Sequence, residues 1–241
     1  MYGLAGLRVP VDGCALVVLF DGGAPVLVRA DATVPLETDA EHAHLRLDDG
    51  DHAFALVFDP AGPPAALDDG EAAVRAGGSL RDEQLCHVHG TVRLGGQSRE
   101  VRCLGQRSRS WGDTDWDRIE ATRALAAWLE DGSGVVLNAV RPAGASTHGR
   151  EAVWAAVVDA KGALRVDEPR LSTTYDDEGR QQRAALELWV GVDDDYPRRA
   201  AGEVVCGSTL DLGALRLDCS FVRWRMAGRT GIGRYDLLRR A

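Results

Sequence analysis

The residues best suited to chemistry lie in one stretch of this 241-residue chain, from Gly105 to Glu120. The stretch contains two tryptophans, three arginines and four carboxylates, although only 6% of the chain is aromatic. A carboxylic acid in an apolar cavity has a raised pKa and can protonate an alkene or enol, and tryptophan faces beside it stabilise the resulting cation. The alternative, which the spacing alone favours, is an ion-paired loop that joins two barrel edges, with the tryptophan rings as plugs.

The arrangement of these side chains depends on the backbone that follows Gly112. If this backbone is extended, Asp113, Asp115 and Asp117 share one face and Trp116 lies on the other. The spacing therefore predicts three carboxylates on one side of the segment.

His87 and His89 form an H-x-H pair in an expected strand, which puts both imidazoles on one face. The opposite face of the same strand is apolar, so the pair is expected on a half-solvated surface, as a candidate part of the substrate-binding site. The sequence offers no third ligand, and a pair alone does not hold a metal. We therefore expect neither a metal nor a cofactor.

Other kinds of site lack their motifs. The chain has no G-x-S-x-G, and strand alternation turns Cys86 away from His87. The Gly231-Ile232-Gly233 run lacks the third glycine and the helix of a dinucleotide loop, so it is expected to be a glycine pair within a strand.

Composition excludes several classes of protein. The net charge is -9 with a pI near 5.2, and no stretch gathers the basic residues, which argues against nucleic acid or an anionic membrane as partner. Five widely spaced cysteines without a C-x-x-C predict no disulfide framework and a reducing environment. No apolar run approaches the roughly 18 residues of a membrane span. We expect a cytoplasmic protein whose ligand is neutral or apolar.

Turn signals recur about every ten residues, which predicts an antiparallel β protein. Two hairpins are expected near the start, with strands at 14–20 and 25–30 and at 42–47 and 52–58. The Pro/Gly segment from Asp59 and the acidic patch up to Glu71 are expected to form a linker. Ala121 to Glu130 has helical propensities but leads into an Asp-Gly turn, so it is expected to be a strand. A dozen or more strands imply a barrel or sandwich that can enclose an apolar ligand.

The tryptophan-rich stretch is similar to a motif of the hydroxyneurosporene synthase (carotenoid hydratase) superfamily, the AttH-type proteins built from two lipocalin-like β domains. One bacterial branch carries a pattern close to Gly-x-Arg-Asp-His-Ser-Trp-Gly-x-Arg-Asp-Trp. The matching positions are Gly105, Arg107, Ser110, Trp111, Gly112, Asp115 and Trp116. The segments 87–95 and 228–233 also resemble the strands that flank the motif. The resemblance implies an all-β, antiparallel lipocalin-like barrel or sandwich over residues 80–241, after a shorter, truncated β unit in residues 1–79.

Two departures separate this chain from the family pattern. Ser108 and Arg109 replace the Asp-His pair that the family's hydratases are thought to use near the reacting double bond. A permanently charged arginine cannot act as a general acid at neutral pH. The glutamate that often follows the last glycine pair is replaced by Arg234-Tyr235-Asp236. The family mechanism therefore cannot be transferred unchanged.

These departures leave a proton donor at another position as one possibility, with Asp115 as the first candidate and Asp113 as the second. Trp111 and Trp116 would then face the developing cation. Arg107 and Arg109 would hold a carboxylate, carbonyl or diphosphate end of the substrate by paired hydrogen bonds. The other possibility is a fold that binds or shapes its ligand without acid chemistry.

The resemblance favours a cofactor-independent lyase or isomerase that acts on a hydrophobic isoprenoid or polyketide-type molecule by cyclisation, isomerisation, hydration or dehydration. A pericyclic cyclase fits the lost Asp-His pair better than a hydratase does. The alternative is a non-catalytic carrier whose pocket is lined by tryptophans, namely Trp111, Trp116, Trp154, Trp189 and Trp224. A structural interaction module is a third class, and the sequence does not indicate the oligomeric state.

Overall fold

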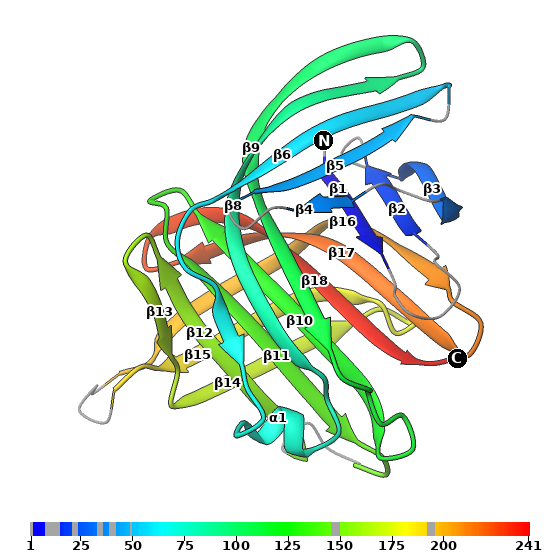
Figure 1. The fold of residues 1–241 in the computed structure, drawn as a ribbon. Helices are drawn as coiled ribbons and strands as arrows, with labels where there is room; N and C mark the ends of the chain where they lie inside the picture. Colours follow the sequence, from blue (N-terminus) through cyan, green and yellow to red (C-terminus); the bar gives the residue numbers. More distant parts are fainter. Residues whose placement is uncertain are drawn as a thin grey trace. The chain divides into compact units, whose positions relative to one another are not determined.

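The structure is a computed structural model that describes residues 2–7, 15–20, 24–32, 36–38, 42–48, 50–145, 150–191 and 196–241. These residues are almost entirely in antiparallel strands (Figure 1), which confirms the expected all-β class. One four-residue helix, α1 (Ala72–Arg75), is present. The described part of the chain contains no helix whose length and apolar character would let it cross a membrane.

The chain divides into two compact units, each made of two segments. Unit 1 comprises Met1–Ala61 and Gln84–Arg107, and unit 2 comprises Gly62–Glu83 and Ser108–Ala241. Strands β8 (Leu80–Leu94) and β9 (Gln97–Trp111) therefore each contribute to both units. The division into contiguous domains at residues 79 and 80 stays a prediction.

Unit 2 is built on a nine-stranded sheet in the order β13-β12-β11-β10-β18-β17-β16-β15-β14. The sheet curls into a half-barrel, because β12 and β14 are far apart in this order and yet contact each other. Its strands are β10 (Ile119–Leu129), β11 (Gly134–Pro142), β12 (Ala152–Asp159), β13 (Gly162–Arg165), β14 (Glu168–Tyr175), β15 (Gln181–Trp189), β16 (Arg198–Asp211), β17 (Leu215–Met226) and β18 (Arg229–Arg240).

Strand β10 shows why a segment with helical propensities is extended here. Residues 123–129 are buried without interruption, so both faces of this strand are covered. A strand buried on both faces has a continuous apolar run rather than an alternating one, and tertiary packing overrides the weak helical preference. The core on one face of the sheet includes Leu125, Leu137, Leu186, Val222 and Trp224.

The glycine pair of β18 permits a close approach of two strands. A Cβ atom added at Gly233 would lie 1.8 Å from the carbonyl oxygen of Ala126, and one at Gly231 would lie 2.3 Å from that of Trp128. Only glycine fits at such distances, so the pair shapes the contact between β10 and β18. This agrees with the expectation of a glycine pair within a strand.

Unit 1 holds the first two expected hairpins. Strands β1 (Tyr2–Leu7), β2 (Ala15–Phe20) and β3 (Pro25–Ala32) form one sheet. In a second sheet, β4 (Leu36–Thr38), β5 (Ala43–Asp48), β6 (His52–Pro60) and β8 follow in order, and β9 pairs with β8. Leu45, Leu47, Phe54 and Val92 form the core on one face of this sheet.

The segment that was expected to be a linker is structured instead. Strand β6 continues through Pro60, and β7 (Ala65–Leu67) pairs with residues 81–83 of β8. The Glu71 carboxylate accepts hydrogen bonds from Nε and Nη2 of Arg165 at 2.6 and 2.8 Å. The boundary between the two units falls within this segment, at Ala61 and Gly62, but contacts distant in sequence stabilise the Pro/Gly-rich chain there.

Candidate functional site

The tryptophan-rich stretch forms the end of β9 and a tight turn before β10. Trp111 is the last residue of β9 and its relative exposure is 45%. Gly112 has φ +80°, in the left-handed region that favours glycine, and Asp113 is exposed. Residues 116–118 form a turn. The prediction of an extended segment with Asp113, Asp115 and Asp117 on one face was therefore wrong.

Asp115 organises this turn. Its backbone oxygen accepts the N–H groups of Arg118 and Ile119 at 3.0 and 3.2 Å, and its Oδ1 accepts the N–H of Asp117 at 3.2 Å. Its own N–H donates to the carbonyl of Gly77 at 3.0 Å. The residue is exposed, so it lacks the apolar enclosure that the acid role requires.

The two arginines of the motif bind neighbouring side chains of β8. Arg107 Nε donates to Oε1 of Gln84 at 2.5 Å within unit 1, and Arg109 Nη2 donates to Oδ2 of Asp82 at 2.8 Å within unit 2. Both pairs follow the same antiparallel register of β8 and β9. The Arg109 side chain is 71% exposed. Each arginine thus already has a partner in the protein.

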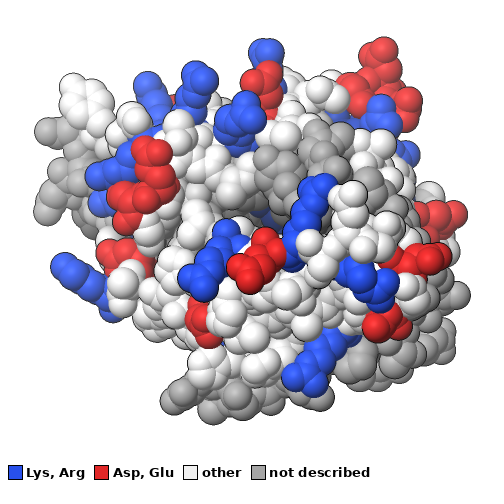
Figure 2. Space-filling model, turned by 90° about the horizontal axis from the view of Figure 1, so that it is seen from above, with Lys and Arg blue, Asp and Glu red and all other residues white. Residues whose placement is uncertain are grey.

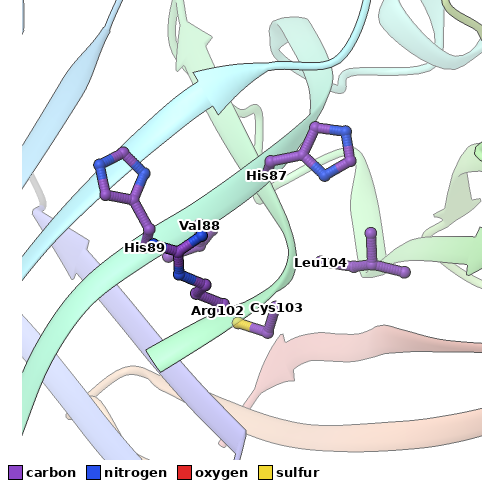
Figure 3. Close-up of a pocket in the computed structure, with 6 residues that line it drawn as sticks. All are labelled: His87, Val88, His89, Arg102, Cys103 and Leu104. Atoms are coloured by element: carbon purple, nitrogen blue, oxygen red, sulfur yellow. The ribbon is translucent and has the colours of Figure 1, made fainter. Parts of the chain in front are cut away.

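A surface hollow of about 590 Å³ lies on β8 and β9 of unit 1 (Figure 3). Its lining contains both predicted histidines, and this volume is typical of small-molecule sites. The complete lining is His87, Val88, His89, Arg102, Cys103 and Leu104. Sequence reasoning missed the three β9 residues of this lining, Arg102, Cys103 and Leu104. The signal that could have found them is the Gly95-Gly96 turn, which pairs their strand with the strand of the two histidines.

Asp59 links two imidazoles at this face of unit 1. Its Oδ2 lies 3.0 Å from Nδ1 of His89, and its Oδ1 lies 3.5 Å from Nε2 of His42. Desolvation by neighbouring atoms raises the pKa of the Cys103 thiol although the residue is exposed, so this cysteine stays protonated at neutral pH. In the described ranges no three His, Cys, Asp or Glu side chains are placed to hold a metal ion.

A second candidate site lies in unit 2, where the carboxylate of Glu83 is buried and that of Asp236 is largely buried, with its side chain 14% exposed. Glu83 on β8 is 2% exposed and forms an ion pair with Arg81, whose Nη2 donates to Oγ of Ser108 at 2.9 Å. Asp236 on β18 forms an ion pair with Nε of Arg234 at 3.0 Å. Burial raises the pKa of Asp236, while the charge of Arg234 opposes this shift.

Asp236 belongs to a row of paired residues across four strands. Asn138, Ala124, Asp236 and Cys219 follow one another in register on β11, β10, β18 and β17, so their side chains share one face. Oδ1 of Asp236 and Nδ2 of Asn138 are buried and have no hydrogen-bond partner among the residues that the structure describes. Burial raises the pKa of Cys219 to about 12, which excludes thiolate chemistry there at neutral pH.

The other face of the same sheet carries a buried network of polar side chains. Arg123 forms an ion pair with Glu151, and its Nη1 donates to the hydroxyls of Thr173 and Tyr235 at 3.1 and 3.3 Å. Arg141 Nε lies 3.0 Å from Oε1 of Glu151. Burial raises the pKa of Tyr235 to about 12, so its hydroxyl remains protonated. The network joins four strands of unit 2 with Glu151, which lies just before β12.

The sequence-based candidates therefore fall into two groups. His87, His89 and Arg107 belong to unit 1, and Arg109, Trp111, Asp113, Asp115 and Trp116 belong to unit 2. Sequence reasoning missed Glu83 and Asn138, and it singled out Asp236 only as a departure from the family pattern. The signal for Asp236 was its position three residues after Gly233 on the last strand.

Basic and acidic side chains are interspersed on the face shown in Figure 2. No extended basic surface is visible there, in keeping with the acidic composition.

Comparisons with known proteins agree on the fold. A family model described as "Domain of unknown function (DUF7064)" matches residues 18–240. No curated protein sequence matches the chain. An AttH-like protein from Nitrosomonas europaea has a similar structure, with a TM-score of 0.66 and 16% identity over 97% of this chain and 84% of that one.

Two further solved structures share this architecture. Kievitone hydratase from Nectria haematococca gives a TM-score of 0.61 at 10% identity, over 98% of this chain and 88% of that one. CghA gives 0.64 at 12% identity, over 99% and 74%. These likenesses confirm the expected lipocalin-like fold of the AttH type. The narrower resemblance to hydroxyneurosporene synthase and its motif stays a prediction.

Proposed function

This chain belongs to the DUF7064 family, and we propose that it is a cofactor-independent enzyme that binds a hydrophobic small molecule and transfers a proton at Asp236. The substrate class is an isoprenoid or polyketide-type molecule. The reaction class is hydration, dehydration, isomerisation or cyclisation. The observation that carries the proposal is the buried Asp236 carboxyl group, which has a raised pKa and an oxygen atom without a partner in the described structure.

A carboxyl group of this kind suits proton transfer to carbon. Protonated Asp236 would give its proton to one carbon of an alkene or enol, whose π electrons form the new C–H bond. The cation on the adjacent carbon is then captured by water or by another double bond of the substrate, or it loses a proton. That final proton returns to the Asp236 carboxylate, so the acid is regenerated.

The neighbouring groups support the two charge states of this acid. Arg234 stabilises the carboxylate that forms when Asp236 has given up its proton. Glu83, itself held by Arg81, adds negative charge nearby that favours the protonated form. Ser108 stands where the family pattern has aspartate and contacts Arg81. We propose that Asp236 replaces the acid that this chain lacks at Ser108.

Asp115 and Asp113 stay alternative candidates for the proton donor. Both are exposed, and the Asp115 carboxylate already caps a turn, so the geometry supports Asp236 better. The two assignments make opposite predictions for single variants.

Hydration is the first reaction to test, because the name of one structural neighbour is kievitone hydratase. The purified protein is incubated in D₂O with kievitone and with a panel of polyprenyl and polyketide alkenes, and products are identified by mass spectrometry. Proton transfer to carbon places one deuterium on carbon in the product. We expect Asp236→Asn to lower the rate about 10²- to 10⁴-fold.

Three controls make this experiment decisive. Asp69→Asn, an exposed carboxylate variant, keeps the wild-type rate, and circular dichroism establishes that Asp236→Asn is folded. Wild-type turnover by Asp236→Asn would refute the proposal. Loss of activity in Asp115→Asn alone would return the acid role to Asp115.

A carrier of hydrophobic small molecules is the second candidate, and the hollow in unit 1 favours it. A carrier would quench tryptophan fluorescence on binding and return its ligand chemically unchanged. An enzyme would release a product of different mass or connectivity. The same incubations therefore separate the two functions.

A further inference from the structure

We propose that the hollow on β8 and β9 binds the anionic end of an amphiphilic small molecule, with Arg102 as the principal contact and His87 and His89 beside it. The ligand class is a carboxylate or phosphate attached to an apolar body. This inference goes beyond the proposed function, because the hollow belongs to unit 1 and its binding step does not require proton transfer at Asp236 in unit 2.

Arg102 is the basis of the proposal because its charge is not compensated. It is exposed at the hollow, and within the described ranges neither a carboxylate nor any other acceptor binds its guanidinium. Two other arginines of this hairpin are engaged, since Arg93 pairs with Asp48 at 3.1 Å and Arg107 donates to Gln84. A guanidinium presents donors that match the two oxygens of a carboxylate or phosphate.

The imidazoles add hydrogen-bonding groups without adding an opposing charge. Asp59 is the carboxylate nearest to His89, and imidazoles lie at both of its oxygens, Nδ1 of His89 at 3.0 Å and Nε2 of His42 at 3.5 Å. This contact orients the His89 ring and leaves its Nε2 edge directed away from Asp59. Figure 3 shows both histidines projecting from β8 and Arg102 rising from the neighbouring strand.

The remaining walls of the hollow are apolar or neutral. Leu104 supplies most of the aliphatic surface, since Val88 is largely buried, and the Cys103 thiol is neutral because desolvation by neighbouring atoms raises its pKa. A volume of about 590 Å³ accommodates part of a small organic molecule in addition to its charged group. The lining thus offers both basic and apolar groups, which suits an amphiphile with an anionic end.

This assignment moves anion recognition to a residue that the sequence motif does not contain. Arg107 and Arg109 were expected to hold the charged end of the substrate, but each already binds a side chain of β8. Arg102 lies on the same strand, five residues before Arg107, and is available. Within unit 1, Arg102 is therefore the arginine that we assign to anion binding.

The proposal is tested by calorimetric titration of the full-length protein with decanoate, decyl phosphate and decanol. We expect decanoate or decyl phosphate to bind, and Arg102→Gln to weaken that binding at least about tenfold, as for loss of a charge-assisted hydrogen-bonded pair. The tighter of the two anions identifies the preferred head group. Arg99→Gln, an exposed arginine of the same strand, is the matched control and keeps wild-type affinity.

Two results would overturn the proposal: equal affinity of wild type and Arg102→Gln for both anions, or decanol binding as tightly as decanoate. His89→Gln is the second variant and weakens anion binding by a smaller factor. The anion titration is scored separately from turnover in D₂O, because Asp236 belongs to unit 2 and is not part of the hollow. Failure of the anion site is thereby distinguished from failure of the proton-transfer function.

Discussion

The buried pair of Arg123 and Glu151 allows a quantitative test of how unit 2 is held together. Their side chains are 3% and 1% exposed, and Glu151 also contacts Arg141. Glu151→Gln preserves the shape of the side chain but removes its charge. Arg123 is then left in the core with only neutral acceptors, namely the amide oxygen of the new glutamine and the hydroxyls of Thr173 and Tyr235. Removing one partner of a buried ion pair destabilises a protein by about 3–5 kcal/mol.

This loss is large enough to measure by two methods. In a protein of this size, 1 kcal/mol lowers Tm by about 2–4 °C, so Glu151→Gln should lower it by roughly 6–20 °C. Urea unfolding at neutral pH, followed by tryptophan fluorescence, gives the free energy directly, because Trp154 and Trp224 are buried. The matched control is Glu71→Gln. Its partner Arg165 is 54% exposed, and such pairs contribute at most about 1 kcal/mol.

The reasoning fails if Glu151→Gln remains within about 1 kcal/mol of the wild type, or if the two glutamine variants are equally destabilised. A double variant, Arg123→Met with Glu151→Leu, supplies the complementary result. It removes both charges and fills the space with apolar atoms, so it should be more stable than Glu151→Gln alone.

Three further results are expected. Gly233→Ala should strongly destabilise the protein in urea. Gly162→Ala should have little effect, because no atom lies within 4 Å of a Cβ added there. Equal urea midpoints of the two variants would contradict this reasoning. The pKa of Tyr235 rises from 10.0 to about 12 on folding, so the unfolded state loses its proton first and stability falls by roughly 3 kcal/mol at most between these pH values. Tyr235→Phe should lack this component of the alkaline loss, measured as the difference in urea midpoints. Exposed Cys103 should react with maleimide before Cys219, whose pKa is about 12, and the reverse order in peptide mapping would contradict the burial.

The strands were predictable because their signals are local. Alternating or continuous apolar runs, bounded by Gly or Asp-Gly turns, lie within ten residues of one another along the chain. The Gly95-Gly96 turn located the hairpin of β8 and β9, and the strand at Ala121 to Glu130 followed from the turn after it. Short elements such as α1 and β7 were missed, because their stability depends on contacts distant in sequence.

The candidate site was less predictable because it depends on pairings between distant strands. Asn138 and Asp236 share a face only through the register of β11, β10 and β18, which no local pattern specifies. Asp115 matched a motif, yet the turn at 116–118 keeps it at the surface. Composition and spacing thus identified the residue types of the candidate site. The pairing of distant strands determines which of the carboxyl groups is shielded from water.

The division of the two units within β8 and β9 affects the order in which the chain can fold during synthesis. Residues 62–83 leave the ribosome before unit 1 receives its last segment, 84–107, and the nine-stranded sheet begins only after that segment. The early segment of unit 2, including α1 and β7, must therefore wait for partners while unit 1 is completed. A nascent chain that stalls just after residue 107 has every segment of unit 1 and none of the strands β10 to β18, so the two units mature in an interleaved order rather than one after the other.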